Sequence, residues 1–225
     1  MKRRTVIGAL AIAVEAGGIV DRLGRTWGST PDERRRALPS DALLPFRHIQ
    51  TDHAVTIAVS PDDVWPWLVQ MGWGRAGWYT YRWVDRLFFP HNGPSSDVIL
   101  PEFQTLSRGD HVPDGAPETG CHFVVEAVEP PRTLVLRSTT HLPPKVRGAS
   151  MDWVWTYTLD PVADGTRLHL RSRLVLEPRR LRWLFRAGLG ADFVMSRSHL
   201  RGIKARAEAA RSSRIAARAM EAAHA

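Results

Sequence analysis

The chain is poor in the residues and motifs that mark metal and catalytic sites. Its single cysteine, Cys121, excludes an intrachain disulfide framework and provides no thiolate cluster for zinc or an iron-sulfur centre. The nine histidines show no spacing of the His-Glu-x-x-His kind, and no serine stands in a Gly-x-Ser-x-Gly turn. We therefore expect no metal and no cofactor, and no motif identifies catalytic residues.

Long hydrophobic runs are also missing. A basic head, Met-Lys-Arg-Arg, precedes a mostly apolar stretch, but Glu15 leaves only nine uncharged residues from Val6 to Val14. Crossing a bilayer takes about twenty. The sequence favours a leader over residues 1–37, amphipathic or disordered, on a cytoplasmic protein. Membrane association through residues 5–20 is the alternative.

The formal charge of +8 lies at the two ends of the chain. Residues 179–225 carry eleven basic and three acidic groups, whereas residues 31–178 carry fifteen basic and eighteen acidic groups. Binding of single-stranded nucleic acid needs basic groups interleaved with stacking aromatics. Here the aromatic cluster and the basic segment are separate, so we expect no nucleic-acid partner. Residues 211–225, which have few large apolar side chains, are predicted to form a frayed basic tail.

Tryptophan is what the chain has in abundance. Five of its nine tryptophans fall between residues 65 and 83, with tyrosines and phenylalanines beside them. Exposure of so many large rings to water would forgo several kcal/mol of burial free energy. The rings must therefore fill a core or line a cavity, and this choice decides the function.

The periodicity of the sequence predicts an α+β domain. Residues 53–60 alternate as a half-buried strand, and a helix follows that is capped by Ser60 or, because Pro66 fits better near a first turn, by Asp62. A second helix is expected over about 78–89, and antiparallel strands over 121–128, 133–138, 151–159 and 166–176. A terminal helix then carries an apolar stripe that includes Phe193, Leu200, Ile203, Ala207 and Ala210. Together these elements predict a curved antiparallel sheet wrapped around a long C-terminal helix, with two short helices after the first strand.

Several short blocks of the sequence resemble the SRPBCC family, the START-like, polyketide cyclase/dehydrase superfamily of helix-grip proteins. They are the tryptophan-rich stretch from Val55 to Tyr81, Ile99-Leu-Pro-Glu102, Arg108-Gly-Asp110, and the closing segment from Asp192 to Lys204. The resemblance spans residues 38–210, which we take as the domain. It implies a hydrophobic cavity between the sheet and the terminal helix, without naming the ligand or any catalytic residue.

We accordingly expect the protein to bind or carry a small hydrophobic or aromatic molecule. The expected ligand-binding residues combine indole rings with polar groups: Gln70, Trp78, Tyr79, Tyr81, Trp83, His111, His122, Trp153 and Trp155, with Arg75 as a further polar candidate.

Two other hypotheses stay open. One is a polyketide cyclase/dehydratase-like enzyme that uses an acid or a histidine in the cavity. Its candidate residues are Asp97, Glu102, Asp110, His111, His122 and His141. The other is a structural module whose cavity is filled by its own aromatic side chains.

Overall fold

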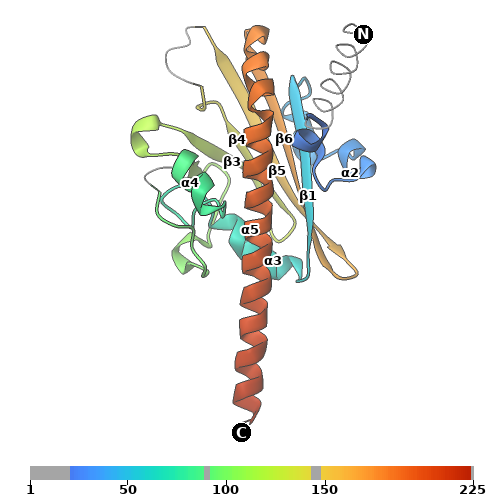
Figure 1. Ribbon diagram of the computed structural model, residues 1–225, viewed down its shortest axis with the longest axis vertical. Helices are drawn as coiled ribbons and strands as arrows, with labels where there is room; N and C mark the ends of the chain where they lie inside the picture. The colour runs from blue at the N-terminus through green and yellow to red at the C-terminus, as the bar shows by residue number, and fades with distance from the viewer. Residues whose placement is uncertain (1–20, 89–91, 143–147, 224–225) are drawn as a thin grey trace, which may run out of the picture.

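The fold is a six-stranded antiparallel sheet crossed on one face by a long helix (Figure 1). The computed structural model describes residues 21–88, 92–142 and 148–223. In their spatial order the strands are β1 (Ile49–Ile57), β6 (Gly165–Glu177), β5 (Ser150–Val162), β4 (Thr133–Ser138), β3 (His122–Glu129) and β2 (His111–Pro113). The crossing helix is α5 (Arg182–Ala223). This arrangement confirms the predicted α+β fold.

Two short helices, α3 (Pro61–Val69) and α4 (Arg82–Phe88), follow β1. The Ser60 hydroxyl accepts a hydrogen bond from the Asp63 amide, so Ser60 is the cap of α3 and Pro66 lies inside the helix. The second helix begins later than position 78, where the sequence predicted its start. Tyr79 has a positive φ of 57°, which no right-handed helix accommodates. The predicted end at residue 89 lies outside the described residues.

The core lies between the sheet and α5. Leu200, Ile203 and Ala207 of the predicted apolar stripe are fully buried there. The helix comes so close to the segment before α4 that a Cβ atom at Gly202 would stand 1.9 Å from the Tyr79 carbonyl oxygen. Any side chain at position 202 would prevent this close approach, so the contact between α5 and this segment requires glycine.

The opposite face of the sheet carries charged side chains. Successive residues of a strand point to opposite faces, so Arg171 of β6 turns away from the core that Leu170 enters. Arg171 is 1% exposed and donates to Asp52 Oδ1 of the neighbouring β1 at 2.7 Å. It also donates to backbone carbonyls of the segment around α2 (Pro31–Arg35), namely those of Glu33, Arg34 and Arg36.

These hydrogen bonds involve the predicted leader, whose described part, residues 21–37, packs against the sheet. The structure shows no boundary at residue 38 between this segment and the rest of the domain. Residues 1–20, which include the segment considered for membrane association, lie outside the described residues. Among the helices that are described, none combines the length and the apolar character needed to cross a bilayer.

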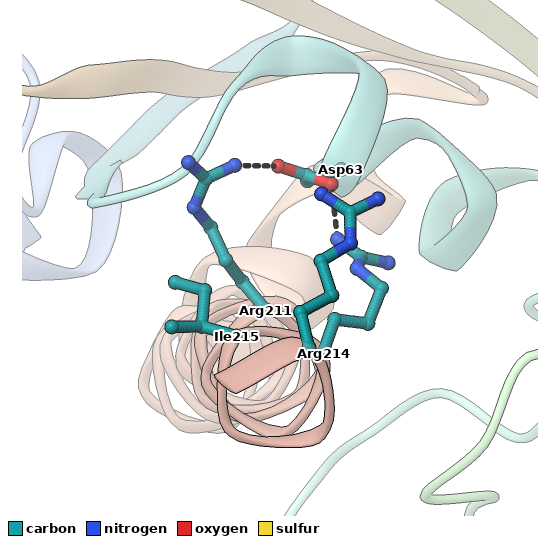
Figure 2. Close-up of a pocket in the computed structure, with 5 residues that line it drawn as sticks. Asp63, Arg211, Arg214 and Ile215 are labelled. Atoms are coloured by element: carbon teal, nitrogen blue, oxygen red, sulfur yellow. Dashed lines mark hydrogen bonds and ion pairs between the residues drawn. The ribbon is translucent and has the colours of Figure 1, made fainter. Parts of the chain in front are cut away.

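The C-terminal part of α5 extends past the domain as a helix up to Ala223, rather than fraying at residue 211 (Figure 1). Alanine and arginine, which dominate this stretch, are strong helix formers. Figure 2 shows Arg211 and Arg214 reaching from α5 to Asp63 in the first turn of α3. The Arg211 Nη1 to Asp63 Oδ2 distance is 2.9 Å. The depression between these side chains has a volume of about 190 Å³. The one carboxylate that lines it, that of Asp63, is already paired with arginines. We therefore interpret this contact as a structural link between α5 and α3.

Candidate functional site: a tryptophan-lined cavity beneath the C-terminal helix

A partly enclosed cavity lies between the sheet and α5. Its volume is about 70 Å³. The lining combines three indole rings, two apolar side chains and several polar groups: Trp78, Trp153, Trp155, Leu170, Met195, Thr80, Asp114, Asp192, Ser196 and His199. The cavity is therefore small and aromatic, and it carries two carboxyl groups.

The aromatic wall comes from two parts of the chain. Trp153 and Trp155 share one face of β5, and Trp78 reaches them from the segment before α4. The Trp78 and Trp155 rings meet edge to face, with centroids 5.7 Å apart, and Trp153 and Trp155 do so at 4.9 Å. Such edge-to-face contacts are favourable and orient each ring. The indoles form an ordered wall that leaves part of the space empty.

His199 of α5 holds Trp78 in place. Its Nδ1 lies 2.5 Å from the Trp78 carbonyl oxygen, and its Nε2 lies 3.0 Å from the Tyr157 hydroxyl of β5. A carbonyl can only accept, so Nδ1 carries the proton and Nε2 accepts from the tyrosine. Burial lowers the pKa of His199 to about 4, although the hydrogen bond to the Trp78 carbonyl acts in the opposite direction and raises it. His199 is thus a neutral structural link at physiological pH.

Asp192 places a carboxyl group on the cavity wall without a partner. It makes no hydrogen bond or ion pair within the described part of the chain, and burial raises its pKa to about 7. A carboxyl with this pKa exchanges its proton near neutrality, which is a property of groups that transfer protons.

Asp114 is the second carboxyl on the wall, and it is the end of a hydrogen-bonded chain. Its Oδ2 lies 2.7 Å from His141 Nε2, and His141 Nδ1 lies 2.6 Å from the Ser138 hydroxyl. Burial raises the pKa of Asp114, and the hydrogen bond from His141 opposes that rise. Serine, histidine and aspartate also make up hydrolase triads, but here only the aspartate lines the cavity, and Ser138 is 3% exposed. The hydrogen bonds from Ser138 and His141 therefore orient the Asp114 carboxyl, and Ser138 is not placed to act as a nucleophile on a ligand.

Two indole N–H groups of the wall have no acceptor. The buried Nε1 atoms of Trp78 and Trp155 lack a hydrogen-bond partner, whereas Trp153 Nε1 donates to Ser172 Oγ at 2.7 Å. The Trp78 indole N–H is directed at the Asp114 carboxyl and lowers its pKa as a donor, although the two groups lie outside ordinary hydrogen-bond geometry. Buried donors without acceptors are uncommon, and each costs about 1–3 kcal/mol.

The other predicted binding residues lie outside the cavity lining. Gln70 and Tyr79 are buried and bonded to each other, with Gln70 Nε2 donating to the Tyr79 hydroxyl at 2.9 Å. That hydroxyl donates to the Trp67 carbonyl, and burial raises the tyrosine pKa above its usual range. Tyr81 and Trp83 are 39% and 56% exposed. Gln70 and Tyr79 thus join elements of the core, and Tyr81 and Trp83 face solvent.

His111 and His122 lie in a separate cleft on the outer side of β2 and β3. Their rings stack with centroids 4.4 Å apart, and Arg75 also lines this space of about 490 Å³. Arg75 donates to the carbonyls of Met71 and Val69, so most of its hydrogen bonds go to the backbone. The cleft is open, and the described residues include no group of three or more side chains placed to hold a metal ion.

The predicted acids also lie apart from the cavity lining. Asp97 pairs with Arg206 at 2.8 Å, and Asp110 accepts from the Ser107 amide at 2.8 Å. Glu102 is exposed on a short 3-10 helix. Of the candidate acids and histidines, only His141 contacts a cavity residue.

Sequence reasoning missed Asp114, Asp192 and His199. For the last two a signal exists, since Asp192, Ser196, His199 and Ile203 recur at helical spacing and share one face of α5. Asp114 lies in a loop, and no local pattern connects it to residues that precede or follow it by dozens of positions.

Comparison with known proteins gives structural neighbours only. The sequence matches no protein-family model and no curated protein. Three solved structures illustrate the neighbours. Protein MLL2253 from Mesorhizobium loti is 20% identical, with 67% of this chain and 94% of that chain covered and a TM-score of 0.41. The di-domain ARO/CYC StfQ of the steffimycin biosynthetic pathway is 17% identical, covering 73% and 52% with a TM-score of 0.44. DynU16, from the dynemicin biosynthetic locus, is 19% identical, covering 68% and 46% with a TM-score of 0.36.

This chain thus spans about half the length of StfQ and of DynU16. At these TM-scores the fold assignment depends on the strand order and on the position of α5, both described above.

Proposed function

We propose that the protein binds a small aromatic or apolar molecule in the cavity beneath α5. The observation that carries the proposal is the combination, on one cavity wall, of three indole rings with two carboxyl groups, of which that of Asp192 has no partner among the described residues. Small-molecule sites typically join an apolar lining with a few polar groups that fix orientation. A ligand that accepts a hydrogen bond would pair with Asp192 in its protonated form, which burial favours.

The volume of the cavity limits the ligand. A dry cavity of roughly 150 Å³ holds benzene, so the 70 Å³ present here is too small for a ring unless a side chain moves. Met195 is the natural candidate, because a methionine side chain is unbranched and repacks easily. With Met195 displaced, we expect ligands of no more than one or two rings.

Tryptophan fluorescence tests the proposal. Titration with 1-indanone and cyclopentanone should give saturable quenching, and Trp155→Phe should weaken the binding at least several-fold. Trp83→Phe is the matched control, because that indole is exposed and outside the cavity lining. If no ketone or matched hydrocarbon quenches saturably, the interior is a filled core and the binding function is wrong. For the carrier form of this function, mass spectrometry should find a small apolar molecule that co-purifies with the protein.

A cyclase- or dehydratase-like enzyme is the second candidate function. The Asp114 and His141 pair favours it, because a general base needs a carboxylate or imidazole positioned in the ligand site. Turnover of a bound ligand that disappears in Asp114→Asn separates this function from binding alone.

A further inference from the structure

Helix α4 presents an amphipathic face that the binding function does not use. Arg82, Trp83, Arg86 and Leu87 are all exposed, and Trp83 and Leu87 leave 56% and 66% of their surface in water. Residues four positions apart lie on the same side of a helix. Trp83 and Leu87 therefore form an apolar stripe, and Arg82 and Arg86 form a basic stripe beside it.

The remaining side of α4 is buried and holds the helix to the domain. Val84 is fully buried, and Asp85, the one acid of the helix, is buried as well. The Thr80 hydroxyl donates a hydrogen bond to the Asp85 carboxylate. No acid of the helix therefore remains on its exposed face, and neither Arg82 nor Arg86 forms an ion pair with any of the described residues.

The size of the apolar stripe distinguishes a membrane from a protein as its partner. Complete cover of a tryptophan side chain buries about 150–250 Å². A stable protein interface needs about 800 Å² from each partner, which the stripe cannot supply even with Leu87 added. A bilayer surface makes no such demand, because a short amphipathic helix at the headgroup level needs only a few apolar side chains and basic groups that attract anionic lipid.

We propose that α4 is a membrane-docking helix, in which Trp83 and Leu87 enter the headgroup region of an anionic bilayer while Arg82 and Arg86 pair with the lipid headgroups. Tyr81, which is 39% exposed just before the helix, adds a ring of the kind that is enriched at membrane interfaces. This surface is distinct from residues 5–20, the segment that the sequence offered for membrane association. In Figure 1, α4 and α2 lie on opposite sides of α5, so the described part of the leader does not cover α4.

The position of α4 connects the docking face to the cavity. Trp78 and Thr80 line the cavity, and Arg82 begins the helix two residues later. The hydrogen bond from Thr80 to Asp85 also joins the cavity wall to the helix. A bilayer that contacts α4 would therefore lie beside the cavity and give an apolar ligand a short path between lipid and protein. This route rests on the proposed binding function, whereas the docking itself does not.

Cosedimentation with lipid vesicles tests the docking. The full-length protein should bind vesicles that contain phosphatidylserine as well as phosphatidylcholine more tightly than vesicles of phosphatidylcholine alone. The double variant Trp83→Ser, Leu87→Ser should weaken binding to the mixed vesicles by about tenfold or more, because both side chains lose their burial in the bilayer. Phe46→Ser is the matched control, since that ring is 86% exposed on another segment of the chain, and it should bind like wild type.

The arginines and the indole have separate readouts. Replacing Arg82 and Arg86 with glutamine should weaken binding to the mixed vesicles by about fivefold for each charge removed and leave binding to pure phosphatidylcholine nearly unchanged. The same change at exposed Arg179 and Arg180 is the control for net charge and should weaken binding far less. Trp83→Phe should still bind, but lipids with brominated acyl chains should quench its tryptophan fluorescence less than that of wild type, because the indole that enters the bilayer is gone.

The outcomes are distinguishable from those of the ligand titration, which needs no vesicles. Absence of binding to the mixed vesicles overturns the docking proposal and leaves ligand binding in the cavity intact. Equal binding by wild type and by Trp83→Ser, Leu87→Ser does the same, and it would place membrane attachment in another segment, such as residues 1–20. A wild-type dimer in gel filtration that this variant loses would make the face a protein interface and would also overturn the proposal. All the variants replace exposed side chains, and urea unfolding like that of wild type verifies that they are folded.

Discussion

Replacement of Asp192 should stabilise the protein, because burial opposes the ionisation of its carboxyl. The ordinary pKa of an aspartate is 3.8, and burial raises that of Asp192 to about 7. Between these pH values the unfolded chain has released the proton and the folded protein still holds it. Stability therefore falls as pH rises from 3.8 to about 7 and stays level above that.

The magnitude follows from the size of the shift. Each pKa unit corresponds to about 1.4 kcal/mol, so an ionised Asp192 lowers the free energy of unfolding by about 4 kcal/mol at pH 8. At pH 5.5 the loss is about 2 kcal/mol, because the folded protein keeps its proton there. Asp192→Asn replaces the carboxyl by a neutral group of the same shape. We expect it to stabilise the protein, and by about 2 kcal/mol more at pH 8 than at pH 5.5.

Urea titrations followed by tryptophan fluorescence measure both quantities. Asp97→Asn is the matched control, since that carboxylate is exposed and its replacement should change the pH dependence little. A gain from Asp192→Asn that is equal at both pH values would show that the carboxyl is not held protonated by burial. A loss of stability would show that Asp192 has a partner that the structure does not contain. Either result refutes the reasoning.

Three further predictions concern other parts of the structure. Arg171→Met should lower the free energy of unfolding in urea by about 3–5 kcal/mol, because it removes the charged partner of buried Asp52 and the donor to three backbone carbonyls, whereas Arg35→Met on the exposed side of α2 should change it by less than about 0.5 kcal/mol. Gly202→Ala should lower the melting temperature despite the better helix propensity of alanine, because the new Cβ would meet the Tyr79 carbonyl at 1.9 Å; an unchanged or higher value would mean that α5 does not approach this closely. Met195→Ala should tighten 1-indanone binding about tenfold, about 1.4 kcal/mol, by enlarging the cavity, and weaker binding would show that Met195 does not limit its volume.

Sequence patterns were sufficient for the fold because they are local. The alternation of Trp153, Trp155 and Tyr157 identified one face of a strand, and the stripe through Leu200 and Ile203 identified the buried face of the helix. Both features place side chains relative to their own element. The order of the elements along the chain then predicted their arrangement, and the resemblance to helix-grip proteins agreed with it.

The candidate site was only partly predictable, because it depends on contacts between distant segments. Trp78 and Trp83 looked alike as members of one helix, yet α4 starts at Arg82 and the left-handed backbone at Tyr79 separates them. One ring is buried in the cavity wall and the other faces solvent. Pairing of Asp114 with His141 joins residues that are 27 positions apart, and no periodicity reports such a contact.

Unpartnered buried atoms do not by themselves identify a binding site, and their positions decide what they mean. Among the described residues, Asp41, His53 and His169 also have a buried side-chain atom without a hydrogen bond. Asp41 and His169 make other contacts in the charged network on the face of the sheet opposite α5, and His53 bonds to the Gly24 carbonyl. Their unused atoms are by-products of packing. Trp78 and Trp155 belong to residues that line the cavity, but their indole nitrogens are just as inaccessible, so these two atoms do not mark a site either. The carboxyl of Asp192 differs, because it borders the empty space and has no partner among the described residues. A molecule that enters this space and pairs with that carboxyl would regain the free energy that its burial costs.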